Sequence, residues 1–320
     1  MNIKRLLLFL LLFVGYYGGG NYALAVSDAK DKYKLQNGIY YALHEDGTAT
    51  VVKIVESGLL DPTTIDIPPY VSSGTTQYVV TDFYLHKTTL KDDLSECPSV
   101  TTINIPPTLK TFYPGKFSID KNQHYDKFVS YYEEDHNSFP TQLPNLRYFN
   151  VHNDNPNFTT VRNQLLVSKD KTILYCCPPG QNDPTAAIFT GIKHFGSYAF
   201  NGCKLQKLII PTSLESVDDN TFSGFSSLVE FANATNNPDT KYQVYNGILF
   251  EFRQDLNKKY TKPSMLVSYP DAKKVEGGYT IWTNDTYGAP SSIAPFAFDD
   301  VVIKNVIMPK TVSETTIGRC

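Results

Sequence analysis

The chain has 320 residues and a formal net charge of −3 at pH 7, and only 19% of its residues are charged. Lys and Arg are scattered along it and form no basic block, which excludes the electrostatic footprint of a nucleic-acid-binding protein. Tyr is abundant at 22 residues, and the many Asn, Thr and Pro residues fit a secreted protein with a β-rich surface.

The first 25 residues have the features of a secretory signal peptide. Lys4 and Arg5 precede an unbroken apolar run over 6–14, and Ala23-Leu-Ala25 is a small-x-small cleavage site. A membrane anchor is the alternative, but a span needs about 20 apolar residues and this run is much shorter. We predict an exported chain that starts near Val26, is secreted or displayed at the cell surface, and has no membrane span after signal removal.

Residues 26–59 are predicted to form an N-terminal β cap. Two alternating apolar segments, 40–44 and 48–52, flank Glu45-Asp-Gly47, and an Asp-Gly pair favours a tight hairpin turn. A polar-edged hairpin at this position would cover the bare apolar end of a repeat stack.

An eleven-residue spacing between an aromatic residue and a proline runs through residues 60–320. Each phenylalanine ends a short motif such as Tyr198-Ala-Phe200, and each proline ends an apolar strand such as Leu208-Ile-Ile-Pro211. One full unit is therefore about 22 residues long, within the range of leucine-rich repeats. This spacing predicts a mainly β, stacked solenoid with one continuous buried column. The residues expected in that column are Phe200, Leu205, Leu208, Ile210, Phe222 and Phe298.

The unit from Tyr198 to Val217 resembles the BspA-type leucine-rich repeat, which reads roughly Ala-Phe-x-x-Cys-x-x-Leu-x-x-Ile-x-Ile-Pro. The match is specific over 190–232, degraded over 97–117 and 289–318, and limited to Ile65-Asp-Ile-Pro68 in the first unit. This resemblance implies an extracellular, non-enzymatic surface protein, and some members of that family bind host components.

Two longer segments, 155–180 and 237–271, resemble each other and are predicted to be strand–turn–strand inserts. Aligning Pro178 with Pro270 places Cys177 opposite Tyr269. Asn37-Gly-Ile in the cap echoes Asn246-Gly-Ile, so this unit is expected three times. A third insert, 118–142, is polar and aromatic and fits no repeat; insertions of this kind usually form loops on one face.

Side chains alternate along a strand, so the residues between the apolar ones are expected to face outward. If the strands are parallel, they lie about 4.8 Å apart and these residues form one continuous ribbon that suits a protein or glycan partner. The alternative is a sheet face that serves solubility only. The predicted partner-binding residues are Thr64, Asp66, Thr102, Asn104, Tyr148, Asn150, Lys207, Ile209, Glu230, Asn305 and Ile307, with Ala232 beside them.

Reactive groups are few, and we predict no catalytic residue, no cofactor and no metal. A cysteine nucleophile needs a histidine base, and Cys177 with His152 or His194 is the pair to consider. The alignment of Cys177 with Tyr269 favours packing instead. Cys97 and Cys203 lie at a small buried position of the repeat, and the five cysteines show no regular disulfide framework.

These observations favour a non-enzymatic, adhesin-like binding protein with an extracellular protein or glycan partner, either host-derived or from a neighbouring cell. A structural module of a bacterial envelope or glycan-uptake assembly is the alternative. A secreted cysteine hydrolase that uses Cys177 is a third hypothesis.

Overall fold

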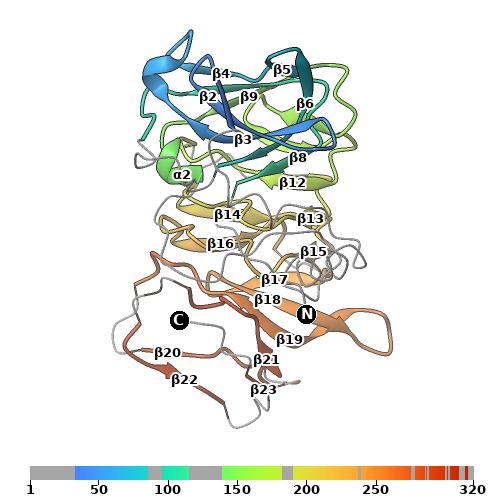
Figure 1. The fold of residues 1–320 in the computed structure, drawn as a ribbon. Helices are drawn as coiled ribbons and strands as arrows, with labels where there is room; N and C mark the ends of the chain where they lie inside the picture. The colour runs from blue at the N-terminus through green and yellow to red at the C-terminus, as the bar shows by residue number, and fades with distance from the viewer. Residues whose placement is uncertain are drawn as a thin grey trace, which may run out of the picture.

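The computed structural model describes residues 33–85, 96–114, 139–181, 190–236, 239–274, 278–284, 286, 288–299, 301, 303–309 and 314–315. The predicted signal peptide and most of the insert 118–142 lie outside these residues. In Figure 1 the elements follow one another from blue to red along a single elongated stack.

Three antiparallel meanders of three strands each organise the stack, which confirms the threefold unit expected from the sequence. The turns of the first and third use Asn37-Gly38 and Asn246-Gly247, where both residues of each pair have positive φ. Two positive φ values define the type I′ turn, whose twist matches that of the flanking strands. At Gly38 an added Cβ would lie 2.5 Å from the Leu59 nitrogen, so only glycine fits. The meanders are β1 (Tyr33–Gln36), β2 (Ile39–Leu43) and β3 (Thr48–Ile54); β10 (Phe158–Val161), β11 (Leu165–Ser168) and β12 (Ile173–Cys176); and β17 (Tyr242–Tyr245), β18 (Ile248–Gln254) and β19 (Tyr260–Ser268).

Each meander's third strand starts a parallel ladder, which we call a rear ladder. In all three the next two strands of that face pair with it in turn, and the pairing of β3 with β6 contains one register shift. The rear ladders are β3 with β6 (Thr76–Tyr84) and β8 (Thr111–Tyr113); β12 with β13 (His194–Phe195) and β15 (Ser216–Val217); and β19 with β21 (Ser292–Ile293) and β23 (Glu314–Thr315).

The opposite side of the stack carries a second set of ladders, which we call the front ladders and which include the strands that lead into the repeat prolines Pro68, Pro106, Pro211 and Pro309. All of them are parallel. They are β4 (Thr64–Asp66) with β7 (Thr102–Ile105) and β9 (Tyr148–Val151); β14 (Lys207–Ile210) with β16 (Glu230–Asn233); and β20 (Tyr279–Thr280) with β22 (Val306–Ile307). A mainly β solenoid with a β cap and β inserts is therefore confirmed.

Phenylalanine rings fill the space between the two faces. Phe200 is fully buried and stacks on Phe222 and Phe225, with ring centroids 5.7 and 5.3 Å apart. Leu205, Leu208 and Ile210 belong to the same cluster, as predicted. Phe298 does not: it is partly buried in a third cluster, against Tyr269. The single continuous column was therefore wrong, because the meander β17–β18–β19 enters between these coils.

Three short elements were not predicted from the sequence. Strand β5 (Tyr70–Ser73) forms a hairpin with β6 in the first coil, and η1 (Glu56–Gly58) is a single 3-10 turn. Helix α2 (Phe139–Gln142) ends the insert, and Phe139 is fully buried against Phe83 and Phe112. The end of the insert 118–142 is thus part of the core. Of the helices in the described ranges, neither has the length and apolar character that crossing a bilayer would require.

We expect Phe200→Ala to lower the free energy of unfolding by about 3–5 kcal/mol, because it leaves a cavity inside a stacked aromatic cluster. Phe298→Ala is the matched control at the equivalent repeat position, and it should cost clearly less because that ring is partly exposed. Urea unfolding followed by circular dichroism measures both. Equal losses for the two variants would contradict the stacking argument.

Candidate functional site

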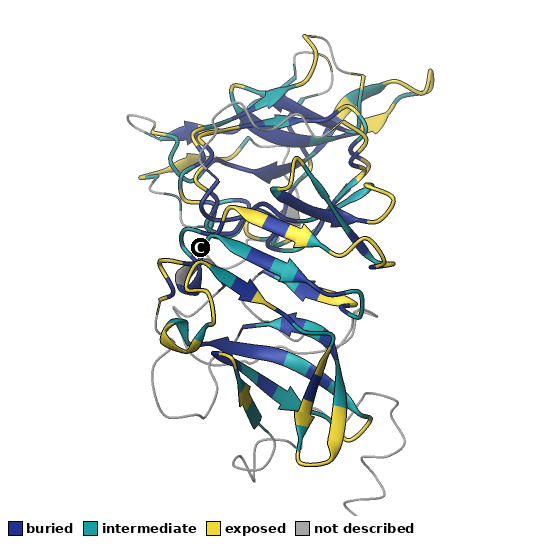
Figure 2. Cartoon of the chain, turned by 90° about the horizontal axis from the view of Figure 1, so that it is seen from above, coloured by how far each residue is buried: buried dark blue, intermediate teal, exposed yellow. Residues whose placement is uncertain are grey.

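The outward residues predicted from the sequence lie on the front ladders, and none of them is buried. Thr64, Thr102 and Tyr148 stand opposite one another across the first front ladder. The second contains the pairs Lys207–Glu230 and Ile209–Ala232, and Asn305 and Ile307 lie at the third. Figure 2 shows this alternation of exposed and buried residues along the strands.

Side-chain amides form a hydrogen-bonded row on the first front ladder. The Asn150 amide donates to Asn104 Oδ1 at 2.9 Å, and the Asn104 amide donates to Asp66 Oδ1 at 3.4 Å. Tyr148 is 41% exposed on the same strand as Asn150. The row therefore presents carbonyl, amide, carboxylate and phenol groups on one exposed face.

The front face is not the continuous ribbon expected from the sequence. The strands fall into three separate ladders. The Phe149 N–H donates to the Asn163 carbonyl at 3.1 Å, and the Phe231 N–H donates to the Gly247 carbonyl at 2.9 Å. Both carbonyls belong to meander turns, so each turn occupies the edge on which the next front strand would pair. We call the three resulting surfaces the first, second and third front panels.

The third front panel also departs from the expected pattern. Val306 and Met308 alternate with the outward residues Asn305 and Ile307 and would therefore face the core, yet they are 36% and 38% exposed, and Ile307 is 55% exposed. Within the residues that the structure describes, the third core cluster packs Ile303 but neither Val306 nor Met308. The inward–outward rule fails here because no described coil packs over this strand.

A hollow of about 260 Å³ adjoins the first front panel at its cap end. Thr64, Asp66 and Asn104 line it together with Leu60, which is 81% exposed. Its remaining lining residues are Asn37, Leu59, Asp61 and Pro68. Sequence reasoning missed the cap side of this hollow; the available signal was the pair of leucines that follows Gly58 outside any strand pattern.

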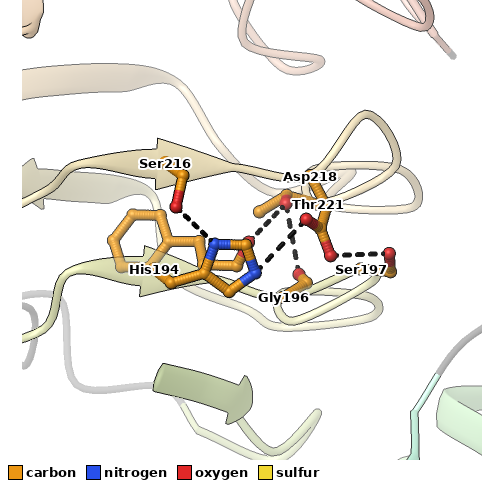
Figure 3. A network of polar contacts seen from close by, with 7 residues as sticks. His194, Gly196, Ser197, Ser216, Asp218 and Thr221 are labelled. Carbon is orange, nitrogen blue, oxygen red and sulfur yellow. Dashed lines mark hydrogen bonds and ion pairs between the residues drawn. The ribbon is translucent and has the colours of Figure 1, made fainter. Parts of the chain in front are cut away.

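A polar network on the rear face joins β13 to β15 (Figure 3). His194 Nδ1 lies 2.7 Å from Ser216 Oγ, and His194 Nε2 lies 3.2 Å from Asp218 Oδ1. The Ser197 hydroxyl donates to Asp218 Oδ2 at 2.9 Å. Thr221 is buried and donates to the Phe195 and Gly196 carbonyls, both at 3.1 Å. His194 and Ser216 are one repeat apart, so the repeat period was the signal that could have found this network.

His194 contacts a serine on one side and an aspartate on the other, as the histidine of a hydrolase triad does. The backbone N–H groups around it, however, are already hydrogen-bonded within the ladder. The Ser216, Asp218 and Gly196 N–H groups donate to the Lys193, Phe195 and Leu174 carbonyls. Those three donors are committed to the ladder and are not available to an oxyanion. The network therefore ties two consecutive coils together.

The network sets the pKa of the Asp218 carboxyl group. Burial by itself raises its pKa, but the hydrogen bonds from His194 and Ser197 and the His194 charge outweigh burial, and the net pKa is lowered. A lowered native pKa adds stability above the ordinary pKa of aspartate, and this stability is lost as the pH falls through the native value.

We expect Asp218→Asn to destabilise the protein at pH 7 by on the order of 1 kcal/mol, a modest value because solvent screens a side chain that is 40% exposed. The difference from wild type should begin to shrink below about pH 4, where the carboxyl of the unfolded chain becomes protonated, and should be lost as the pH falls through the lowered native pKa. Urea unfolding at pH 7 and pH 3 measures it.

Asp219→Asn is the control for charge removal. Burial, and then the charge of Asp218, raise the pKa of Asp219, so its removal should not destabilise the protein at pH 7. A loss for Asp219→Asn equal to that for Asp218→Asn would contradict the network.

The cysteine hypothesis gains no support from the geometry. Cys177 is fully buried, and its pKa is raised first by burial and then by its contact with Cys203. His194 contacts Ser216 and Asp218, and His152 lies 3.8 Å from Asp154. Neither histidine is thus placed as a base for Cys177. Within the described ranges, no three His, Cys, Asp or Glu side chains gather closely enough to hold a metal ion.

The stacked coils with parallel ladders define a leucine-rich-repeat solenoid. Residues 185–248 match the family described as "BspA type Leucine rich repeat region (6 copies)", which confirms the resemblance over that segment. No curated protein matches the chain.

Several solved bacterial structures are similar to this chain at low identity. A leucine rich cell surface protein from Faecalibacterium prausnitzii is 16% identical, with 88% of this chain and 72% of that chain covered and a TM-score of 0.35. A leucine-rich repeat protein from Eubacterium ventriosum is 13% identical, with 88% of this chain and 61% of that chain covered and a TM-score of 0.39. Pneumococcal vaccine antigen PcpA is 15% identical, with 88% of this chain and 82% of that chain covered and a TM-score of 0.32. This chain spans less than two thirds of the length of the Eubacterium protein.

Proposed function

We propose that this chain is a secreted or cell-surface binding protein that recognises an extracellular protein or glycan through its front face. The observation that carries the proposal is the exposed amide row of the first front panel, which runs beside Tyr148 and into a hollow. The predicted signal peptide and the BspA type repeat region support the location.

The chemistry of this panel suits a polar, extended partner. Amides both donate and accept hydrogen bonds, so Asn104 and Asn150 can read hydroxyl or peptide groups of either polarity. Tyr148 offers apolar contact area together with a polar tip, the combination found at binding hot spots. Because strands of a ladder lie about 4.8 Å apart, these groups recur at a fixed interval along the panel.

The second and third front panels extend the proposed face. Lys207 pairs with Glu230 at 2.6 Å, so part of the charge on the second panel is already neutralised within the protein. Ile209, Asn305 and Ile307 add a mixed polar and apolar surface. The partner is proposed to bind mainly at the first panel, where no such pair occupies the polar row.

We expect Tyr148→Ala combined with Asn150→Ala to weaken partner binding at least about tenfold, or about 1.4 kcal/mol, because both side chains lie on one exposed strand. The melting temperature should stay nearly unchanged, since neither side chain is buried. A partner would first be isolated by pull-down against matrix proteins and mucins and by a glycan array.

Lys207→Ala on the second panel is the matched control, and it should reduce affinity much less. Equal losses at the two panels would show that binding is not centred on the first. An affinity untouched by all three substitutions would place the binding face elsewhere. Deleting 118–142 is a poor test, because it removes Phe139 from the core.

A further inference from the structure

Cys177 and Cys203 bring their sulfur atoms together inside the second coil cluster. The two Sγ atoms lie 2.8 Å apart, and both residues are almost wholly buried, at 0% and 1% exposure. A disulfide bond is about 2.05 Å long, so the sulfurs need to approach by less than about 1 Å to be linked.

The backbone holds each cysteine firmly in place. The Cys177 N–H donates to the Ala199 carbonyl at 2.7 Å, and the Cys203 N–H donates to the Phe200 carbonyl at 3.0 Å. Cys177 directly follows β12, and Cys203 follows the motif that ends in Phe200. The pair therefore lies between the end of the second meander and the next coil. Both residues belong to the cluster around Phe200.

Two other cysteines are placed differently. Cys176 packs into the first core cluster, whereas Cys177 and Cys203 both belong to the second. Cys97 also belongs to the first cluster, where its sulfur lies 4.0 Å from the Ile54 carbonyl. The fold therefore selects Cys177, rather than the adjacent Cys176, as the partner of Cys203.

The third meander shows that this position does not demand cysteine. Its Tyr269 N–H donates to the Ala297 carbonyl at 2.8 Å, the counterpart of the bond from Cys177 to Ala199. Tyr269 is fully buried and packs against Phe298 and Tyr279. Where the third meander uses aromatic packing to hold its coil, the second places two thiols in contact.

We propose that Cys177 and Cys203 form a disulfide that ties the second meander to the coil that follows it. The bond forms by exchange with an oxidised dithiol or a low-molecular-weight disulfide, such as oxidised glutathione. One protein thiolate attacks the external disulfide, which forms a mixed disulfide and releases the first external thiolate; the second protein thiolate then attacks the protein sulfur of the mixed disulfide and displaces the other external thiolate. Two electrons pass to the external disulfide, whose sulfurs leave as two thiols that carry the two protons. The exchange takes place during folding, before the sulfurs are buried.

The test refolds the reduced full-length chain in a buffer of oxidised and reduced glutathione. The sample is quenched in acid, unfolded, alkylated with N-ethylmaleimide and digested without reduction. Cleavage after Lys171, Lys193 and Lys204 puts Cys177 and Cys203 on separate peptides. We expect a linked peptide pair, with fragmentation placing the maleimide on Cys176. A link between Cys176 and Cys203, or maleimide on all three cysteines, would overturn the proposal.

The melting temperature provides an independent test for the same disulfide bond. The link closes a loop of 26 residues, so oxidised wild type should melt on the order of 5 °C above the reduced protein. Cys203→Ser should remove this difference, and Cys97→Ser, the control at the equivalent repeat position, should keep it. A redox-dependent shift that persists in Cys203→Ser would assign the effect to another pair. If Cys203→Ser does not fold, the peptide analysis of wild type still decides the question.

Discussion

Ring stacking between successive coils is the interaction on which this structure depends. A single coil of about 22 residues has too little thickness to bury its own apolar face, so each coil needs the next to complete the core. Phe83 on Phe112 and Phe200 on Phe222 do this in two different clusters, with interplanar angles of 6° and 15°. The parallel ladders on both faces keep the rings in register, and the outward residues follow from that register.

The meanders give this stack its second constraint. Each one supplies the third strand on which a new rear ladder is built, so the rear face also consists of three separate ladders. On the front side the turns of the second and third meanders offer a carbonyl to Phe149 and Phe231 and end the ladder there. The same element therefore starts a new ladder on the rear face and ends one on the front face. A partner that binds the front face meets short panels rather than a long ribbon.

The repeat period was enough to predict the solenoid, the buried Phe200 cluster and the outward positions, since all of these depend on spacing alone. The resemblance of 155–180 to 237–271, together with the Asn-Gly pairs of the first and third units, was enough to predict the repeated meander, because both signals are local in the sequence. The division into panels was not predictable, because it depends on a tertiary hydrogen bond to the Asn163 carbonyl. Helix α2 was missed for a related reason: only the packing of Phe139 against Phe83 distinguishes it from the polar insert before it.

The second and third meanders have the same backbone hydrogen bonds but different side chains at the bonded positions. The Cys177–Ala199 and Tyr269–Ala297 hydrogen bonds are equivalent, and so are those of Gly180 to Leu146 and of Ala272 to Leu228. The side chains at these positions nevertheless differ in size and chemistry. The ladder sets where a coil lies, and the local packing decides how firmly it is held. A solenoid built this way can change the groups on one coil, inside or outside, without changing the register of the others. Variation in the exposed residues of the first front panel therefore costs the core little.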